Sequence, residues 1–77
     1  MNVEIREYKN GKFKVWIDNK VLYYSKAMKA LGHDPRLEGS HQEHNIDPYN
    51  TIEEARENAL IYQEYHDGIT VVKKHKL

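Results

Sequence analysis

The sequence predicts a single α+β domain in which a four-stranded, mostly antiparallel sheet packs one face against a long helix. Two observations lead to this prediction. Apolar and polar residues alternate along residues 3–24 with turn signals between the runs, and an amphipathic helical pattern follows over residues 51–68. Because a chain of 77 residues has room for one core only, residues 1–77 are expected to form one domain. The expected order is three strands, a short helix, a loop, the long helix and a final strand.

The first two strands are predicted over residues 3–8 and 13–17. A two-residue turn between them would mix charged side chains into the apolar face. A three-residue loop with Gly11 in a left-handed β-bulge instead sets Ile5 opposite Val15 and keeps that face apolar. We therefore predict the bulged loop.

A second, tighter hairpin is predicted at residues 18–19 and leads into a third strand over residues 20–24. In this two-residue register Val15 faces Leu22, which extends the same apolar face. One face of the sheet is therefore expected to form the core. Its predicted members are Val3, Ile5, Phe13, Val15, Ile17, Leu22 and Tyr24.

A short helix is predicted over residues 25–31, because Ser25 can cap its start and Gly32 can end it in a left-handed conformation. Residues 32–50 follow with no regular period, and they contain both prolines and three of the five histidines. A loop of this length is uncommon in a compact domain and tends to be functional or mobile. We expect residues 32–50 to form a long irregular loop.

The long helix is predicted to begin after Thr51, which forms a capping box with Glu54. Asp67 and Gly68 are expected to end it. One side of the helix carries the stripe that should meet the sheet. This stripe consists of Ile52, Ala55, Ala59, Tyr62 and His66.

A final strand is predicted over residues 69–72, where four β-branched residues follow one another. A right-handed crossover would return this strand to the sheet beside the first strand and parallel to it. The order across the sheet would then be fourth, first, second, third. Since one helix covers only one face, the other face is expected to stay open.

Charge is segregated along the chain although the formal net charge is zero. Residues 1–30 carry a net charge of +4, residues 31–67 carry −7, and residues 68–77 carry +3, with a basic tail at residues 73–77. The overall balance argues against a polybasic arm or general coating of DNA. The segregation can steer a charged partner.

The absence of cysteine excludes the disulfide-rich secreted class and favours a cytoplasmic protein. No apolar run approaches the roughly 20 residues that a membrane-spanning helix needs. The first residues show no signal-peptide pattern. We therefore expect a soluble cytoplasmic protein that does not bind membranes.

The open sheet face is the first candidate binding surface. It would hold Trp16, Val21 and Tyr23 beside the cations Lys14 and Arg6. Aromatic side chains interleaved with cations can stack bases and hold phosphates, so a single-stranded nucleic-acid-binding module is the alternative function. The structural alternatives are that the short helix folds over this face or that a second copy packs on it.

The outer side of the long helix offers a second surface. Leu60 and Ile61 project away from the packing stripe, and Tyr49 lies just before the helix. Apolar side chains grouped in this way form an association surface. Contact with a protein partner is therefore the interaction that we expect first, with self-association into a homodimer as its simplest form.

Metal and catalytic chemistry have weaker support. His41 and His44 have the spacing of metal ligands, but no predicted helix orients them, so no metal site is expected. The sequence contains no nucleophile elbow, glycine-rich phosphate loop or zinc-protease pattern, and a domain of this size has little room for an enclosed pocket. We expect no enzymatic activity, no cofactor and no small-molecule substrate.

Residues 11–74 combine a charged hairpin, a helix that opens with Thr51-Ile52-Glu53-Glu54-Ala55, and a closing strand. This layout resembles small phage-encoded host-takeover proteins and short α+β proteins of bacteria and mobile elements, with residues 25–50 inserted here. The resemblance implies a binding role without catalysis. The expected function is thus a small regulatory protein, such as a host-directed inhibitor, that acts through protein contacts at Trp16, Tyr23 and Lys14, with residues 33–49 as the second choice.

Overall fold

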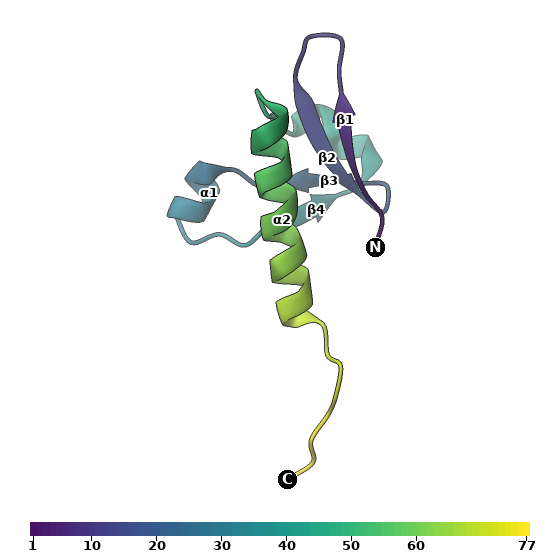
Figure 1. Cartoon of the computed structure of the whole chain (residues 1–77), viewed down its shortest axis with the longest axis vertical. Helices are drawn as coiled ribbons and strands as arrows, with labels where there is room; N and C mark the ends of the chain where they lie inside the picture. The colour runs from purple at the N-terminus through teal and green to yellow at the C-terminus, as the bar shows by residue number, and fades with distance from the viewer.

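The computed structural model covers residues 1–77 and describes all of them apart from the side chains of residues 40–42. It contains a four-stranded antiparallel sheet with one long helix on one face, which confirms the predicted α+β fold (Figure 1). The strands are β1 (Val3–Glu7), β2 (Phe13–Ile17), β3 (Lys20–Tyr23) and β4 (Arg36–Glu38). The helices are α1 (Lys26–Ala30), the 3-10 helix η1 (Ser40–Asn45) and α2 (Ile52–Ile69).

The β1–β2 hairpin has the predicted register and loop. Ile5 pairs with Val15, as the bulged loop requires. The backbone N–H of Tyr8 donates to the carbonyl of Lys12 at 2.9 Å, and Gly11 has a φ of 77°. A left-handed glycine therefore closes the loop as a bulge.

The β2–β3 hairpin is also as predicted. Asp18 and Asn19 have φ values of 49° and 65°, the paired left-handed conformation of a type I′ turn. Trp16 then pairs with Val21. Each hairpin places one of its two faces against α2. The buried core on this side consists of Val15, Ile17, Leu22, Tyr24, Tyr49, Ala55, Ala59 and Tyr62.

Helix α2 begins as its capping residues predict. The hydroxyl of Thr51 accepts a hydrogen bond from the N–H of Glu54 at 3.1 Å. Ala55 and Ala59 are buried and allow the helix backbone to approach the sheet closely. Asn58 is also buried, and its amide nitrogen donates to the carbonyl of Glu54 at 2.9 Å, which satisfies part of its hydrogen-bonding capacity inside the interface.

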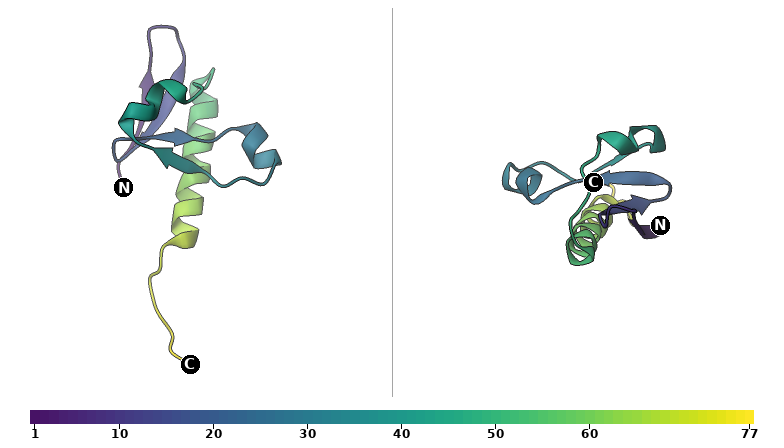
Figure 2. Two further views of the ribbon diagram at one scale, coloured as in Figure 1. Left: turned by 180° about the vertical axis from the view of Figure 1, so that it is seen from behind. Right: turned by 90° about the horizontal axis from the view of Figure 1, so that it is seen from above.

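The predicted strand over residues 69–72 is wrong. Helix α2 continues through Gly68 to Ile69, and the N–H of Thr70 closes it on the carbonyl of His66 at 3.1 Å. Residues 70–77 then run away from the body of the domain as an exposed tail (Figures 1 and 2). The helix takes Ile69 out of the predicted strand, and both the backbone N–H and the hydroxyl of Thr70 donate to the carbonyl of His66 in the helix rather than to a neighbouring strand.

The fourth strand comes from the predicted loop over residues 32–50. Strand β4 pairs antiparallel with β3, with Leu37 opposite Leu22, and the order across the sheet is β1-β2-β3-β4. Residues 40–45 add η1, so the prediction of a wholly irregular loop is also wrong. Strand β4 forms because it pairs the outer backbone groups of β3 and adds Leu37 to the core.

The second face of the sheet is partly covered, which corrects the expectation of an open face. Helix η1 contacts β3 on the side opposite α2, as the view from above shows (Figure 2). Trp16, Val21 and Ile46 form a second buried cluster there. The residues that follow β4 therefore cover this face, because they bring Ile46 onto the indole ring.

Candidate functional site

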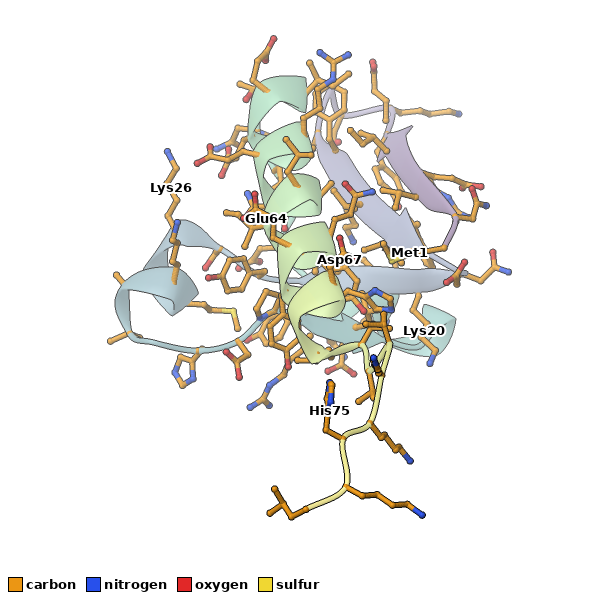
Figure 3. The ribbon with its side chains drawn as sticks, turned by 60° about the horizontal axis from the view of Figure 1, so that its bottom comes forward. Met1, Lys20, Lys26, Glu64, Asp67 and His75 are labelled. Carbon is orange, nitrogen blue, oxygen red and sulfur yellow. The ribbon has the colours of Figure 1, made fainter. Side chains whose placement is uncertain are left out.

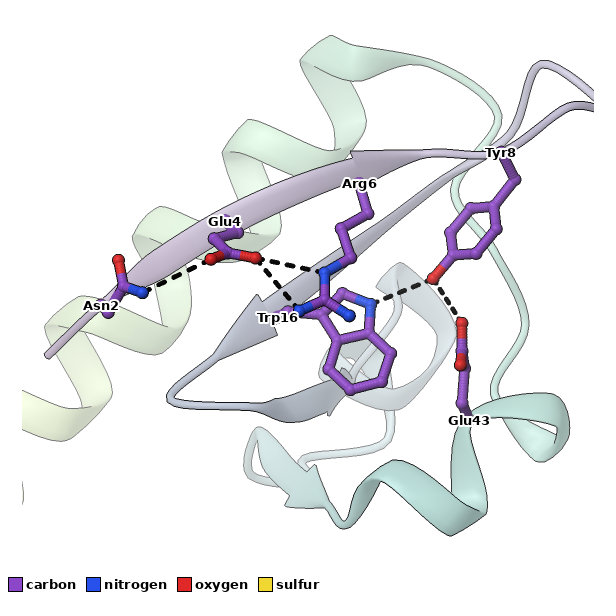
Figure 4. A network of polar contacts seen from close by, with 6 residues as sticks. All are labelled: Asn2, Glu4, Arg6, Tyr8, Trp16 and Glu43. Carbon is purple, nitrogen blue, oxygen red and sulfur yellow. Dashed lines mark hydrogen bonds and ion pairs between the residues drawn. The ribbon is translucent and has the colours of Figure 1, made fainter.

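Trp16 lies in a polar network rather than on an exposed surface. Its side chain is 3% exposed, and its indole Nε1 donates to the hydroxyl of Tyr8 at 3.0 Å. That hydroxyl in turn donates to Oε1 of Glu43 in η1 at 2.5 Å (Figure 4). The guanidinium of Arg6 lies over the ring, 4.1 Å from its centre, in a cation–π contact. The indole is thus held between β1 and η1 and is not available to a partner.

The predicted cations belong to the same network. Nζ of Lys14 donates to the backbone carbonyl of Glu43 at 2.7 Å, and Arg6 forms an ion pair with Glu4 at 3.1 Å. Burial, together with the hydrogen bond to Glu43, raises the pKa of Tyr8 above its ordinary value of 10.0. The Tyr8 hydroxyl therefore keeps the proton that it donates. These groups position η1 over the sheet.

Tyr49, predicted on the association surface, lies in the main core instead. Its backbone forms a two-way bridge with Phe13, with N···O distances of 2.7 and 2.9 Å. Its hydroxyl donates to the carbonyl of Tyr24 at 2.7 Å. Burial raises its pKa well above 10.0, so the side chain stays neutral. Tyr49 thus extends the sheet at β2 and fills the core.

Tyr23 is the predicted aromatic binding residue that keeps a large exposed surface, at 41%. Val21 on the same strand face is fully buried, and Ile61 of α2 is half-buried against the main core. Because side chains alternate along a strand, Tyr23 lies on the η1 side of the sheet together with Val21. Val21 is covered there, whereas Tyr23 is not. Leu60 also stays exposed on the outer side of α2, as predicted.

Tyr23 lies where three shallow hollows of the described surface meet, between α1, β4 and the segment that follows η1. Their volumes are about 140, 350 and 290 Å³, and Tyr23 lines each of them. We call this surface the Tyr23 groove. The residues that line it with Tyr23 include Tyr24, Met28, Leu31, Arg36, Ile46 and Pro48.

The wall of the groove on one side is α1, a helix of five residues without a buried side chain. The hydroxyl of Ser25 caps it by accepting from the N–H of Met28 at 3.2 Å, and Leu31 at its end is 75% exposed. Charged residues also line the groove, with Asp47 in one hollow, Arg36 in the second and Glu38 in the third. An apolar hollow with so exposed a wall suits side chains of a macromolecule, whereas small-molecule pockets enclose most of their ligand.

Metal binding gains no support from the described residues. His44 is exposed, and the side chain of its predicted partner, His41, lies outside the described part of the chain. Among the described residues, no group of three His, Cys, Asp or Glu side chains is placed to hold a metal ion.

Sequence reasoning missed Glu43 and Ile46, the two residues that bring η1 onto the sheet. Ile46 carried a usable signal, because it is the one Val, Ile or Leu between residues 38 and 51. A single aliphatic side chain in a polar segment is a candidate anchor for that segment. Glu43 carried none, since its partner Tyr8 is 35 residues away.

Within the described part of the chain, no helix is both long and apolar enough to cross a membrane. No protein-family model matches the chain, and no curated protein or solved structure is significantly similar to it. The function must therefore be inferred from the geometry and chemistry of the surface.

Proposed function

We propose that this chain is a small, non-enzymatic binding protein that regulates another protein by contact, and that the Tyr23 groove is its contact surface. The observation that supports the proposal is an exposed tyrosine where two mainly apolar hollows and a third, more polar one meet, beside the exposed Leu31 and the half-buried Met28. Tyrosine and methionine are enriched in protein interfaces because each offers a large contact area.

A protein partner is favoured over a single-stranded nucleic acid. The nucleic-acid alternative relied on Trp16 and Lys14, which are engaged with Tyr8 and Glu43. Base stacking needs an accessible aromatic face, and the indole is 3% exposed. The groove itself is lined by Asp47 and Glu38 as well as Arg36, and carboxylates there oppose a phosphate backbone.

The proposed setting is the cytoplasm, because a chain without cysteine has no disulfide to stabilise it in an oxidising compartment. The charged hairpin and α2 keep part of the layout that resembles phage-encoded host-takeover proteins, whereas the closing strand of that layout is not formed. On that partial resemblance, the proteins of a bacterial host are the first partners to test.

The proposal is tested with a photo-crosslinking amino acid in place of Leu31, in cells that naturally contain the protein. We expect a discrete cross-linked species that disappears when Tyr23→Ala is added. Leu60→Ala is the matched control, because Leu60 is an equally apolar exposed residue on α2, and it should leave the cross-link unchanged.

Two outcomes would overturn the proposal. One is a cross-link at residue 31 whose yield is the same with and without Tyr23→Ala. The other is a cross-linked species that nuclease digestion removes, which would establish the nucleic-acid alternative.

A further inference from the structure

Strand β1 leaves one edge of the sheet unpaired within the described chain. The carbonyl of Asn2 accepts from the N–H of Asp18, and the N–H of Tyr8 donates to Lys12, so the even-numbered residues of β1 bond to β2. In an antiparallel ladder the residues between them direct their backbone groups outward. Three N–H donors and three carbonyl acceptors are therefore free at this edge. They belong to Val3, Ile5 and Glu7.

The edge is open to strand addition. Strand β1 contains no proline, and its register with β2 runs without a bulge over all five residues. Edge strands without such interruptions pair readily with another chain. The opposite edge of the sheet, by contrast, ends in β4 with only three residues.

The tail carries a segment with the properties of a strand. Residues 69–72 are all β-branched, Thr70 already has an extended backbone with φ −81° and ψ 118°, and Val72 is 94% exposed. The tail projects beyond the end of α2, and His75 lies on this projecting part (Figure 3). Such an apolar, extended segment gains most by pairing with a free sheet edge.

The edge of β1 in the same chain does not suit this segment. Helix α2 packs on β1 and continues to Ile69, so the tail would have to reverse immediately after the helix. The turn would then include residues 70–72, which could no longer pair as a strand. A second copy can offer its β1 edge without any reversal.

A parallel register matches the two segments best. On the side of the sheet that faces α2, it places apolar residues beside apolar residues and a lysine beside a glutamate. The antiparallel register with the same central pair would place Lys73 beside Val3. The pairs in the parallel register are Val3 with Ile69, Ile5 with Val71 and Glu7 with Lys73. Ile69 joins the strand by unwinding the last residue of the helix, where helices fray at little cost.

We propose that residues 69–73 of one copy add as a parallel fifth strand to the β1 edge of a second copy, and that the exchange is reciprocal and gives a dimer. This surface lies on β1 and does not involve the Tyr23 groove.

The absence of cysteine in the chain makes a direct test possible. Two separate preparations, one with Glu7→Cys and one with Lys73→Cys, are mixed and oxidised. We expect a disulfide-linked heterodimer in several-fold higher yield than from Glu7→Cys mixed with Lys76→Cys. Val72→Pro in the Lys73→Cys chain should remove that excess, because in this register the N–H of Val72 is the donor to the carbonyl of Ile5, proline has no N–H, and Val72 is outside the folded core.

The proposal fails if the heterodimer yields for Lys73→Cys and Lys76→Cys are equal. It also fails if a chain that carries both Glu7→Cys and Lys73→Cys closes on itself as a monomer, since the tail would then pair with its own β1. Sedimentation of the unmodified chain as a single-chain particle at the cross-linking concentration would overturn it independently.

Discussion

The hydroxyl of Tyr8 donates a hydrogen bond to Glu43, 35 residues further along the chain, at 2.5 Å. This contact joins the end of β1 to η1 above the indole of Trp16, whose Nε1 donates to the same hydroxyl (Figure 4). One phenol thus satisfies a buried indole N–H and anchors the segment that covers it.

Tyr8→Phe should destabilise the domain by about 1–3 kcal/mol, because it leaves the Trp16 N–H without its partner while keeping the ring. Urea unfolding measures the change in the free energy of unfolding. Tyr23→Phe, at an exposed side chain, is the matched control and should change it by less than about 0.5 kcal/mol. Equal losses in the two variants would contradict the role of the Tyr8 hydroxyl.

Trp16 is the single tryptophan, so its fluorescence reports directly on the cover formed by η1. We expect blue-shifted emission and protection from acrylamide in the native chain. Glu43→Ala, which removes the carboxylate bonded to Tyr8, should shift the emission to the red and increase quenching, with the circular dichroism of α2 retained. Glu43→Gln keeps an acceptor and should have a smaller effect. Native emission equal to that of the unfolded chain would show that the indole is not buried.

Replacement of glycine by alanine should lower the free energy of unfolding at residue 11 and raise it at residue 68. Gly11 has a φ of 77°, and no atom lies within 4 Å of the place that an alanine Cβ would take, so Gly11→Ala should cost about 1–2 kcal/mol through backbone conformation alone. Gly68 lies inside α2 with equally free space, and Gly68→Ala should stabilise the domain by up to about 1 kcal/mol. Thermal unfolding of both variants measures the difference. A loss of stability in Gly68→Ala would place the end of α2 before Gly68.

Stability should fall above about pH 10, because burial raises the pKa of Tyr49 above the value of 10.0 that it has in the unfolded chain. Below that pH both states hold the proton and no dependence arises. Above it the unfolded state binds fewer protons, and the slope from one group approaches about 1.4 kcal/mol per pH unit.

Tyr49→Phe should make this alkaline slope shallower, although it costs about 1 kcal/mol at neutral pH through loss of the bond to the Tyr24 carbonyl. Part of the slope should remain, since the pKa values of Tyr8 and Tyr62 are also raised by burial. Urea unfolding between about pH 8 and about pH 11 measures both slopes. An unchanged slope in Tyr49→Phe would show that another group titrates.

The sequence by itself determined the parts of the fold that depend on neighbouring residues. Gly11 predicted the bulged loop, Thr51 predicted the start of α2, and alternation predicted which strand residues meet the helix. Each of these rests on turn conformation, capping or side-chain period, which act within a few residues.

Only the tertiary structure decided which elements residues 36–46 form and that residues 70–77 stay outside the sheet. Strand β4 is too short to show a period, and its place depends on the unpaired edge of β3. The cover over Trp16 depends on Glu43 meeting Tyr8, a contact that no local pattern encodes. For the same reason Trp16 is buried while Tyr23, on the same face, stays exposed. Burial on a sheet face depends on which distant segment forms hydrogen bonds and apolar contacts there.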